Sequence, residues 1–264
     1  MLNATDITVT LGGRPVLRGV PFRAEPGQIS AIVGPNGSGK TTLLRAMTGD
    51  VSHGGTVELN GFDTTALRPW DLAAMRAVLP QSSALAFPFS VAEVVRLGLQ
   101  AGSCGDQPDI VRQALALAGL DGYQDKLCQE LSGGEQQRVH LARVLCQVWQ
   151  PVENRMPRWL FLDEPVASLD IGHQLAVMEI ARSFAQRGGG VVVVMHDLNL
   201  TAMFADQMTV LSQGRVLASG PTPEVMTNAV LSEAYGCALK VNTAPGNGTT
   251  FLLPHVAERV ALGP

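Results

Sequence analysis

The 264-residue sequence is poor in charge: Asp, Glu, Lys and Arg together make up 16% of it, against about 25% in an average globular protein. It contains no run of five or more Lys and Arg residues, and its formal net charge is −4. Proteins that bind nucleic acid show a basic patch or balance, so we expect no nucleic-acid partner. Two interpretations of the low charge stay open: an Ala-, Gly- and Val-rich composition, or a surface partly covered by partner proteins.

The sequence also shows no cysteine motif, no pattern typical of a leader and no long hydrophobic run. The sequence has four cysteines, at Cys104, Cys128, Cys146 and Cys237. None of them forms a Cys-x-x-Cys pair, which predicts reduced thiols in a cytosolic protein. The amino terminus lacks a basic segment followed by an apolar one, so no secretory signal is expected. Apolar runs such as 190–195 are far below the roughly 18 residues of a membrane-spanning helix, so any work at a membrane is expected to go through another chain.

Runs typical of strands alternate with segments typical of helices. Strands are expected at 7–10, 29–33, 56–59, 76–79, 159–163, 191–195 and 208–212. Helices are expected at 39–47, 90–99, 109–120, 134–148 and 171–187. Three of the strand segments, 29–33, 159–163 and 191–195, are continuously apolar, as strands are in a parallel sheet buried on both faces. The alternation therefore predicts an α/β fold with a mainly parallel sheet.

The alternation breaks between about 82 and 155, where almost every segment is typical of a helix. We expect this stretch to be a helical subdomain inserted into a single α/β domain. After Gly214 the pattern predicts a hairpin, two short helices and a last strand near 250–253. The predicted division is a core of about 1–81 and 156–220, a helical insertion of about 82–155 and a carboxy-terminal extension of about 221–264.

The segment GPNGSGKTT at 34–42 follows an apolar strand and opens a predicted helix. It matches G-x-x-x-x-G-K-[ST], the phosphate loop, in which Lys40 reaches the β- and γ-phosphates and the Thr41 hydroxyl binds Mg²⁺. The alternative is a glycine-rich turn that happens to contain lysine, and the strand before and helix after argue against it. The residues expected to bind nucleotide are Gly34, Pro35, Asn36, Gly37, Ser38, Gly39, Lys40, Thr41 and Thr42.

The segment WLFLDEP at 159–165 places two carboxylates at the end of an apolar strand. Asp163 is positioned to bind Mg²⁺ at a neighbouring phosphate loop. Glu164 is one residue further on and points differently, so it can accept a proton from an attacking water as general base. Alone, the motif is also typical of an Asp-Glu-Pro turn that closes a strand. Together with the phosphate loop, it favours functional roles for both carboxylates.

A second segment suited to phosphate, LSGGEQQRV at 131–139, places a Ser-Gly-Gly turn before a helical run. With the phosphate loop, FLDEP, SLD at 168–170 and VVVVMHD at 191–197, it resembles the motifs of the nucleotide-binding subunits of ATP-binding cassette (ABC) transporters, in their order and approximate spacing. The resemblance covers nearly the whole chain. It implies a P-loop NTPase (RecA-like) core, an amino-terminal antiparallel β subdomain, an inserted α-helical subdomain, and ATP and Mg²⁺ as cofactors.

In that family LSGGEQQRV is the signature motif, and two subunits dimerise head to tail with two ATP between them. The resemblance therefore implies that Ser132, Gly133 and Gly134 cover the ATP bound by a second copy of the chain. It also implies an integral membrane permease dimer as partner and, indirectly, a periplasmic substrate-binding protein. The expected location is peripheral, at the cytoplasmic face of the inner membrane.

Three single residues match the family by position. Gln81 resembles the Q-loop glutamine, which contacts Mg²⁺ and passes motion to the permease. His196 resembles the switch histidine that orients the γ-phosphate, and Asp170 resembles the D-loop aspartate that meets the opposite subunit. Each has a simpler alternative: Gln81 as an exposed turn residue, His196 as a neighbour of a helix cap, and Asp170 as the cap of the helix from Ile171.

One position departs from the family. Many members carry an aromatic residue, usually Tyr, near the end of the first strand, where it stacks on adenine. Here the matching position is Leu11, which can pack against a purine but offers no ring. Either a second aromatic substitutes for it, or adenine is held loosely.

The stretches 77–98 and 147–165 resemble the haem (hemin) importer branch, whose relatives are iron-siderophore and vitamin B12 importers. The implied function is ATP hydrolysis that powers haem import, with a ferric-siderophore or vitamin B12 importer as the alternative. An exporter ATPase of the same class is harder to exclude. A chromosome-maintenance ATPase would need a long coiled coil between phosphate loop and signature, and only 91 residues lie between Lys40 and Ser132. A translation factor of the family would need two cassettes.

Overall fold

The computed structural model describes residues 1–81, 87–102, 105, 107–246 and 248–254. Its strands are β1 Leu2–Leu11, β2 Arg14–Ala24, β3 Ile29–Val33, β4 Gly54–Leu59, β5 Phe62–Asp63, β6 Arg76–Leu79, β7 Val152–Glu153, β8 Met156–Pro157, β9 Trp159–Asp163, β10 Gly190–Val194, β11 Gln207–Ser212 and β12 Arg215–Pro221. Its α-helices are α1 Lys40–Met47, α2 Pro69–Met75, α3 Val91–Ala101, α4 Pro108–Leu117, α5 Gly133–Gln147, α6 Ile171–Gln186, α7 Leu198–Phe204, α8 Thr222–Val225 and α9 Asn228–Tyr235. A 3₁₀ turn spans Cys128–Glu130.

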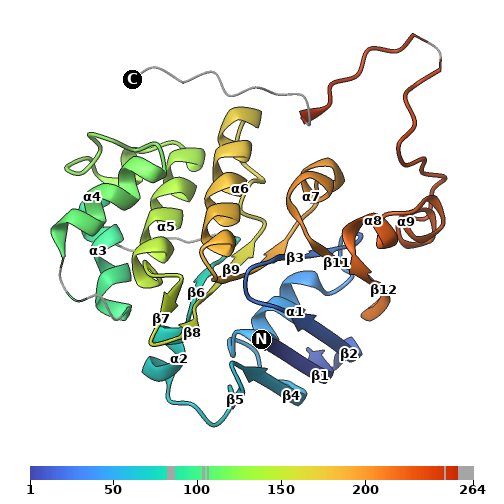
Figure 1. The fold of residues 1–264 in the computed structure, drawn as a ribbon, viewed down its shortest axis with the longest axis horizontal. Helices are drawn as coiled ribbons and strands as arrows, with labels where there is room; N and C mark the ends of the chain where they lie inside the picture. The colour runs from blue at the N-terminus through green and yellow to red at the C-terminus, as the bar shows by residue number, and fades with distance from the viewer. Residues whose placement is uncertain (82–86, 103–104, 106, 247, 255–264) are drawn as a thin grey trace.

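A six-stranded sheet with the order β12-β11-β3-β10-β9-β6 forms the centre of the molecule (Figure 1). All neighbouring strands in it are parallel except β12, which pairs antiparallel with β11. The three continuously apolar strands, β3, β9 and β10, are adjacent and buried throughout, which confirms the mainly parallel α/β sheet. Because parallel strands end at one edge of a sheet, the segments that follow these three strands come together there.

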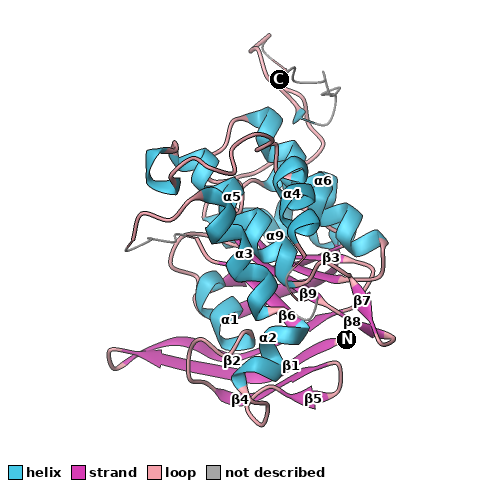
Figure 2. Cartoon of the chain, turned by 90° about the vertical axis from the view of Figure 1, so that its left-hand side faces the viewer, coloured by secondary structure: helices cyan, strands magenta, loops and turns pink. Residues whose placement is uncertain are grey.

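A separate antiparallel sheet with the order β2-β1-β4-β5 contains the amino terminus and confirms the expected β subdomain (Figure 2). Helix α1 lies between the two sheets. Its buried side chains Leu43, Leu44 and Met47 share one apolar cluster with Ile7 of β1 and Val192 of β10. The helix that follows the phosphate loop is therefore fixed from both sides.

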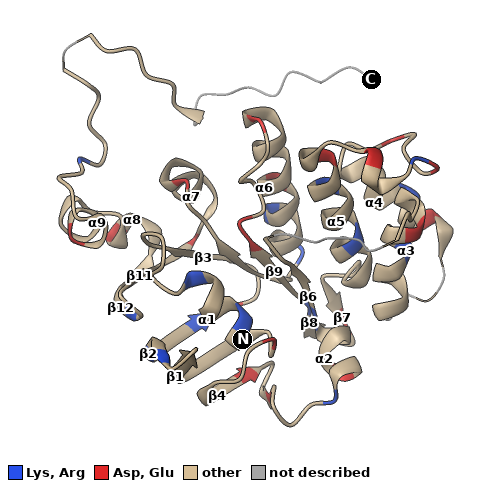
Figure 3. Cartoon of the chain, turned by 180° about the vertical axis from the view of Figure 1, so that it is seen from behind, with Lys and Arg blue, Asp and Glu red and all other residues tan. Residues whose placement is uncertain are grey.

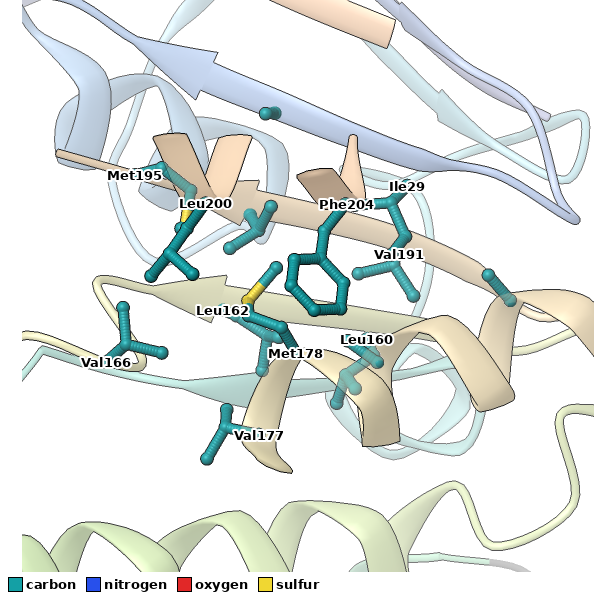
Figure 4. Packing of buried hydrophobic residues seen from close by; sticks show 14 of the residues in the cluster. Ile29, Leu160, Leu162, Val166, Val177, Met178, Val191, Met195, Leu200 and Phe204 are labelled. Carbon is teal, nitrogen blue, oxygen red and sulfur yellow. The ribbon is translucent and has the colours of Figure 1, made fainter. Parts of the chain in front are cut away.

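The opposite face of the central sheet is covered by α6 and α7 (Figure 4). Met178 and Phe204 of these helices pack with Ile29, Leu160 and Val191 of the strands. The carboxy-terminal helices α8 and α9 extend the same cluster. Helices α5 and α6 carry few acidic and basic residues, and in each helix the acidic residue precedes every basic one (Figure 3).

Helices α3, α4 and α5 stand beside the central sheet and have an apolar cluster of their own, as expected for an inserted helical unit (Figure 1). Helices α3 and α5 pack closely at Gly98, where a Cβ atom would lie 1.9 Å from the Arg143 carbonyl oxygen. No helix in the described ranges is both long and apolar enough to cross a bilayer.

One sequence-based expectation is wrong. Residues 250–253 form no strand, because Phe251, Leu252 and Leu253 pack on no sheet edge and stay 52%, 71% and 41% exposed. Residues 152–157, at the expected boundary between the helical insertion and the core, form the small β7–β8 hairpin. It is anchored to the core because Arg158 donates hydrogen bonds to Glu153 and to the Ala74 carbonyl. Helix α2 lies outside the helix ranges expected from the sequence, and α7 corresponds to the helix whose cap is expected next to His196.

Candidate active site

The phosphate loop joins β3 to α1 and depends on glycine. Gly34, Gly37 and Gly39 have φ angles of 145°, 77° and 104°, which side-chain-bearing residues rarely adopt. At Gly34 a Cβ atom would also lie 2.1 Å from the Leu211 carbonyl oxygen. Gly39 is the residue before the first turn of α1, so the loop presents the amino-terminal end of a helix, where an anion is favoured.

Lys40 is buried at the base of this loop. Its ammonium group donates hydrogen bonds to the carbonyl oxygens of Gly34 (2.9 Å) and Pro35 (3.1 Å). Burial lowers the pKa of Lys40, while the nearby carboxylates of Glu164 and Asp163 raise it. The loop therefore holds a positive charge that phosphate oxygens can engage in place of the carbonyls.

Thr41 and Asp163 bring two oxygen ligands together from α1 and the end of β9. The Thr41 hydroxyl donates a 2.9 Å hydrogen bond to Asp163 Oδ1, and Asp163 is 1% exposed. Burial raises the pKa of Asp163, partly offset by the Thr41 hydrogen bond. Hard oxygen ligands in small number fit Mg²⁺, which keeps waters and binds substrate phosphates as well. Within the described ranges no group of three or more His, Cys, Asp or Glu forms a metal cluster. Thr41 and Asp163 therefore fit a Mg²⁺ site with two protein ligands.

Glu164 is held from two neighbouring strand ends. Its Oε1 lies 2.5 Å from His196 Nε2, after β10, and its Oε2 accepts a 2.8 Å hydrogen bond from Gln81 Nε2, after β6. Its φ is 51°, a strained value for a residue with a side chain. The strain and both hydrogen bonds fix the direction of the carboxylate, so three residues expected from separate motifs meet here.

A cavity of about 620 Å³ unites these groups. Its lining residues are Leu11, Val16, Asn36, Gly37, Gly39, Lys40, Thr41, Thr42, Gln81, Glu164 and His196. Its volume is within the range of small-molecule sites. Leu11 is 47% exposed and lies at this cavity as expected. Val16, from the facing strand of the β1–β2 hairpin, was missed; the only available signal was its place opposite the end of β1.

The second phosphate-suited segment lies elsewhere. Ser132, Gly133 and Gly134 do not line the cavity, and Ser132 caps α5. The Glu135 carboxylate accepts hydrogen bonds from the Ser132 hydroxyl (2.7 Å), the Ser132 amide (2.8 Å) and the Tyr123 hydroxyl (2.9 Å). These bonds lower the pKa of Glu135 to about 2. The capped helix end is thus rigid but is not combined with this chain's own phosphate loop.

The start of α5 faces the SLD segment. A Cβ atom on Gly134 would lie 3.2 Å from Leu169 Cδ2 and 3.4 Å from the Ser168 carbonyl oxygen. Asp170 accepts hydrogen bonds from the amide (3.0 Å) and Nδ1 (2.8 Å) of His173. Asp170 is therefore the cap of α6, the simpler alternative, and a role toward a second subunit stays a prediction.

His196 is not a helix cap, because Asp197 caps α7. The Asp197 carboxylate accepts hydrogen bonds from the amides of Asn199 (2.7 Å) and Leu200 (3.0 Å). This arrangement leaves the imidazole of His196 free to face Glu164. His196 is thus the neighbour of a helix cap, as the simpler alternative has it, and it also lines the cavity; a role toward the γ-phosphate stays a prediction.

More than half of the chain matches a known protein family. The model of the ABC transporter family matches residues 17–167. The chain belongs to the ABC transporter family. The hemin import ATP-binding proteins HmuV of Roseobacter denitrificans and of Jannaschia sp. are 64% and 61% identical to this ABC protein, each over 98% of the chain and 99% and 96% of their own lengths.

Solved structures confirm the P-loop NTPase fold expected for this ABC protein. An ATP-binding subunit of an ABC transporter has a TM-score of 0.75 at 22% identity and covers 90% of this chain and 94% of its own. The dimeric structure of a bacterial ABC transporter cassette has a TM-score of 0.74 at 25% identity and covers 84% and 99%. Residues 82–86 of the stretch 77–98, one basis for the haem-branch expectation, lie outside the described residues.

Proposed function

We propose that this chain is the ATP-hydrolysing subunit of an importer and that it powers haem uptake through a membrane permease. The observation that carries the ATPase part is the meeting of Lys40, Thr41 and Glu164 around one cavity, with Asp163 hydrogen-bonded to Thr41. Support for haem comes from the relatives at 64% and 61% identity, which are named hemin import proteins. A ferric-siderophore or vitamin B12 importer is the alternative.

In this proposal the chain's own groups divide the work of phosphoryl transfer. Backbone amides of residues 34–42 and the Lys40 ammonium bind the phosphates, and Glu164 takes the proton of the attacking water. His196 orients the γ-phosphate. Thr41 and Asp163, with Gln81 nearby, would hold Mg²⁺, which would neutralise charge that develops on the phosphates.

The separation of Ser132–Gly134 from the phosphate loop supports a two-chain site. Two copies would face each other head to tail, so that each capped α5 terminus covers the ATP on the other copy. Asp170 would lie at that interface. The helical unit of about 82–155 would move against the core of about 1–81 and 156–220 as ATP binds and is hydrolysed, with about 221–264 as an extension. Gln81 would transmit the movement to the permease.

The proposed partners are a second copy of this chain and a permease dimer, with a periplasmic substrate-binding protein acting indirectly. The proposed location is peripheral, at the cytoplasmic face of the inner membrane. No nucleic acid is involved in this proposal.

The test is transport in vesicles. The chain is purified with its co-expressed permease and reconstituted, and ATP-driven uptake of haem, a ferric siderophore and cobalamin is compared. Vesicles with Glu164→Gln serve as the matched control, because the fold and partners stay the same. Haem uptake by vesicles with the unaltered chain, and none by vesicles with Glu164→Gln, supports the proposal. Uptake of only a siderophore or cobalamin overturns the haem assignment, and ATP-independent uptake overturns the ATPase assignment.

A further inference from the structure

The last helix, α9, packs against the sheet strands that border the phosphate loop. It contacts β11 and β12, and β11 is the direct neighbour of β3. Leu231 and Ala234 on α9 are buried in the same apolar cluster as Ala31 and Val33 of β3. The helix ends at Tyr235, since Gly236 follows in the left-handed conformation with φ 69°. Tyr235 is therefore fixed at the end of a docked helix.

The Tyr235 hydroxyl lies close enough to the backbone of Gly34, the first glycine of the phosphate loop, to be influenced by it. The oxygen is shielded from solvent and has no hydrogen bond of ordinary geometry to any described residue. Burial raises the pKa of Tyr235, and the backbone amide of Gly34 acts in the opposite direction by lowering it. The phenol thus stays protonated at neutral pH and lies next to a backbone group that it can bind.

Gly34 is confined on its other sides as well. Its carbonyl accepts the Lys40 hydrogen bond (2.9 Å). The Leu211 carbonyl and the Ser38 hydroxyl lie 2.1 and 3.0 Å from where a Cβ atom would be. The Ser38 hydroxyl, like that of Tyr235, is buried and has no partner among the described residues. Two shielded hydroxyls therefore lie beside Gly34, one of the two residues whose carbonyls accept hydrogen bonds from Lys40.

Tyr235 does not line the cavity, so it approaches the loop from behind. A group there cannot touch ATP, but it can limit the positions of the Gly34 peptide and, through it, of Lys40. Preorganising a binding loop raises affinity because less freedom is lost on binding.

We propose that Tyr235 is a positioning residue for the phosphate loop: its hydroxyl binds the Gly34 backbone when the loop holds phosphate, so that nucleotide affinity depends on the docked carboxy-terminal helix. The inference rests on the proposed function only in taking ATP as the nucleotide. In this inference the carboxy-terminal extension contributes to nucleotide affinity through Tyr235.

The test compares Tyr235→Phe with Tyr123→Phe in the full-length chain. Tyr123 is the other tyrosine of the sequence, and its hydroxyl binds Glu135 at the start of α5, so each variant loses one tyrosine hydroxyl. Equilibrium binding of ATP is measured by titration calorimetry, with thermal unfolding recorded with and without ATP. Loss of one hydrogen bond predicts a Kd that is about three- to tenfold higher for Tyr235→Phe, with KM raised alike and kcat unchanged.

The unfolding temperature without ATP is expected to stay the same in Tyr235→Phe, since no hydrogen bond of the hydroxyl is lost there, while the rise on adding ATP becomes smaller. Tyr123→Phe is expected to keep the unaltered Kd when binding is measured on the monomeric chain, in which no α5 end of a second copy covers the nucleotide. An unaltered Kd in Tyr235→Phe overturns the inference, and so does an equal change in both variants. A raised Kd in a chain that fails to transport haem would overturn the proposed cargo and leave this inference standing.

Discussion

The imidazole of His196 lies 2.5 Å from Glu164, measured from Nε2 to Oε1. The other carboxylate oxygen of Glu164 accepts a hydrogen bond from Gln81. The three side chains follow β10, β9 and β6, so the order of parallel strands in the sheet brings them together. The proposed base is thus aligned by one residue on each side, and one of these, Gln81, begins the connection toward the helical unit.

Replacing Glu164 with Gln tests its role as base. The amide keeps the size of the side chain and one acceptor oxygen but cannot accept the proton, so kcat is expected to fall by about 10²- to 10⁴-fold. ATP affinity is expected to change little, and ATP-held dimers are expected to accumulate. Phosphate release and size-exclusion chromatography with ATP measure the two effects. Turnover at the normal rate would show that another group takes the proton.

Asp163 is a proposed Mg²⁺ ligand whose buried carboxylate lowers the stability of the fold at neutral pH. Burial raises its pKa, so the folded protein binds this proton more tightly than the unfolded chain does. Stability from this group therefore increases as pH falls through the folded pKa, and the ionised form is destabilising at neutral pH. Asp163→Asn should remove the cost of burying the ionised carboxylate. Each kcal/mol added to the free energy of unfolding raises the unfolding temperature by about 2–4 °C.

The same variant is expected to lose Mg²⁺-dependent hydrolysis while keeping ATP affinity measured in EDTA, because the Asn carbonyl still accepts the Thr41 hydrogen bond. Scanning calorimetry at pH 7 and Mg²⁺ titration of the ATPase rate check both parts. Thr41→Val, which removes the other ligand, is the matched control. A lower unfolding temperature for Asp163→Asn would contradict the stability argument. An unchanged dependence of its ATPase rate on Mg²⁺ would contradict the assignment of Asp163 as a ligand.

The shared site can be tested by mixing two inactive chains. Lys40→Ala destroys the phosphate loop of its own chain, and Ser132→Arg blocks the capped helix end that the chain offers its partner. A mixed dimer then has one site with both halves intact and one site with both halves broken. We expect each variant alone to be inactive and the mixture to recover part of the ATPase rate. If mixing restores nothing, each chain must complete its own site.

Much of the site was predictable because its residues follow strands that the sequence marks clearly. The apolar runs of β3, β9 and β10 identify buried parallel strands, and the polar residues after them must meet at one edge. The features that were missed depend on long-range contacts. Val16 reaches the cavity only through the β1–β2 pairing, and Tyr235 reaches Gly34 only because α9 folds back on β11. Residues 250–253 show the reverse error, since an apolar run without a sheet edge to join forms no strand.

Glu135 should make the stability of α5 depend on pH in the acid range. Its pKa is lowered to about 2, chiefly by the hydrogen bond from the Ser132 hydroxyl. A lowered carboxyl pKa contributes stability above the unfolded value of about 4.3 and loses it as pH falls toward the folded value. Glu135→Gln is therefore expected to lower the free energy of unfolding at pH 7 by about 0.5–1 kcal/mol, as for loss of a helix cap.

This difference between Glu135→Gln and the unaltered chain should shrink steadily between pH 4.5 and the folded pKa of about 2. Urea unfolding at a series of pH values measures it. Glu130→Gln, which lies before the cap and outside these hydrogen bonds, is the control. A difference that stays constant down the series would mean that the ionised carboxylate is not what stabilises the helix start.

Leu11 offers a gain-of-affinity experiment. It lies 47% exposed at the cavity, near Val16 and without an aromatic ring among the lining residues other than the imidazole of His196. Leu11→Tyr adds a ring to a β-strand position that tolerates it, and stacking on adenine contributes about 0.5–1.5 kcal/mol. The Kd for ATP is therefore expected to fall by roughly two- to tenfold. Tripolyphosphate, which lacks adenine, should bind Leu11→Tyr and the unaltered chain equally, and Leu11→Ala should bind ATP slightly more weakly. If Leu11→Tyr improves ATP and tripolyphosphate alike, the ring acts on the phosphate loop and not on the base, and Leu11 does not contact adenine.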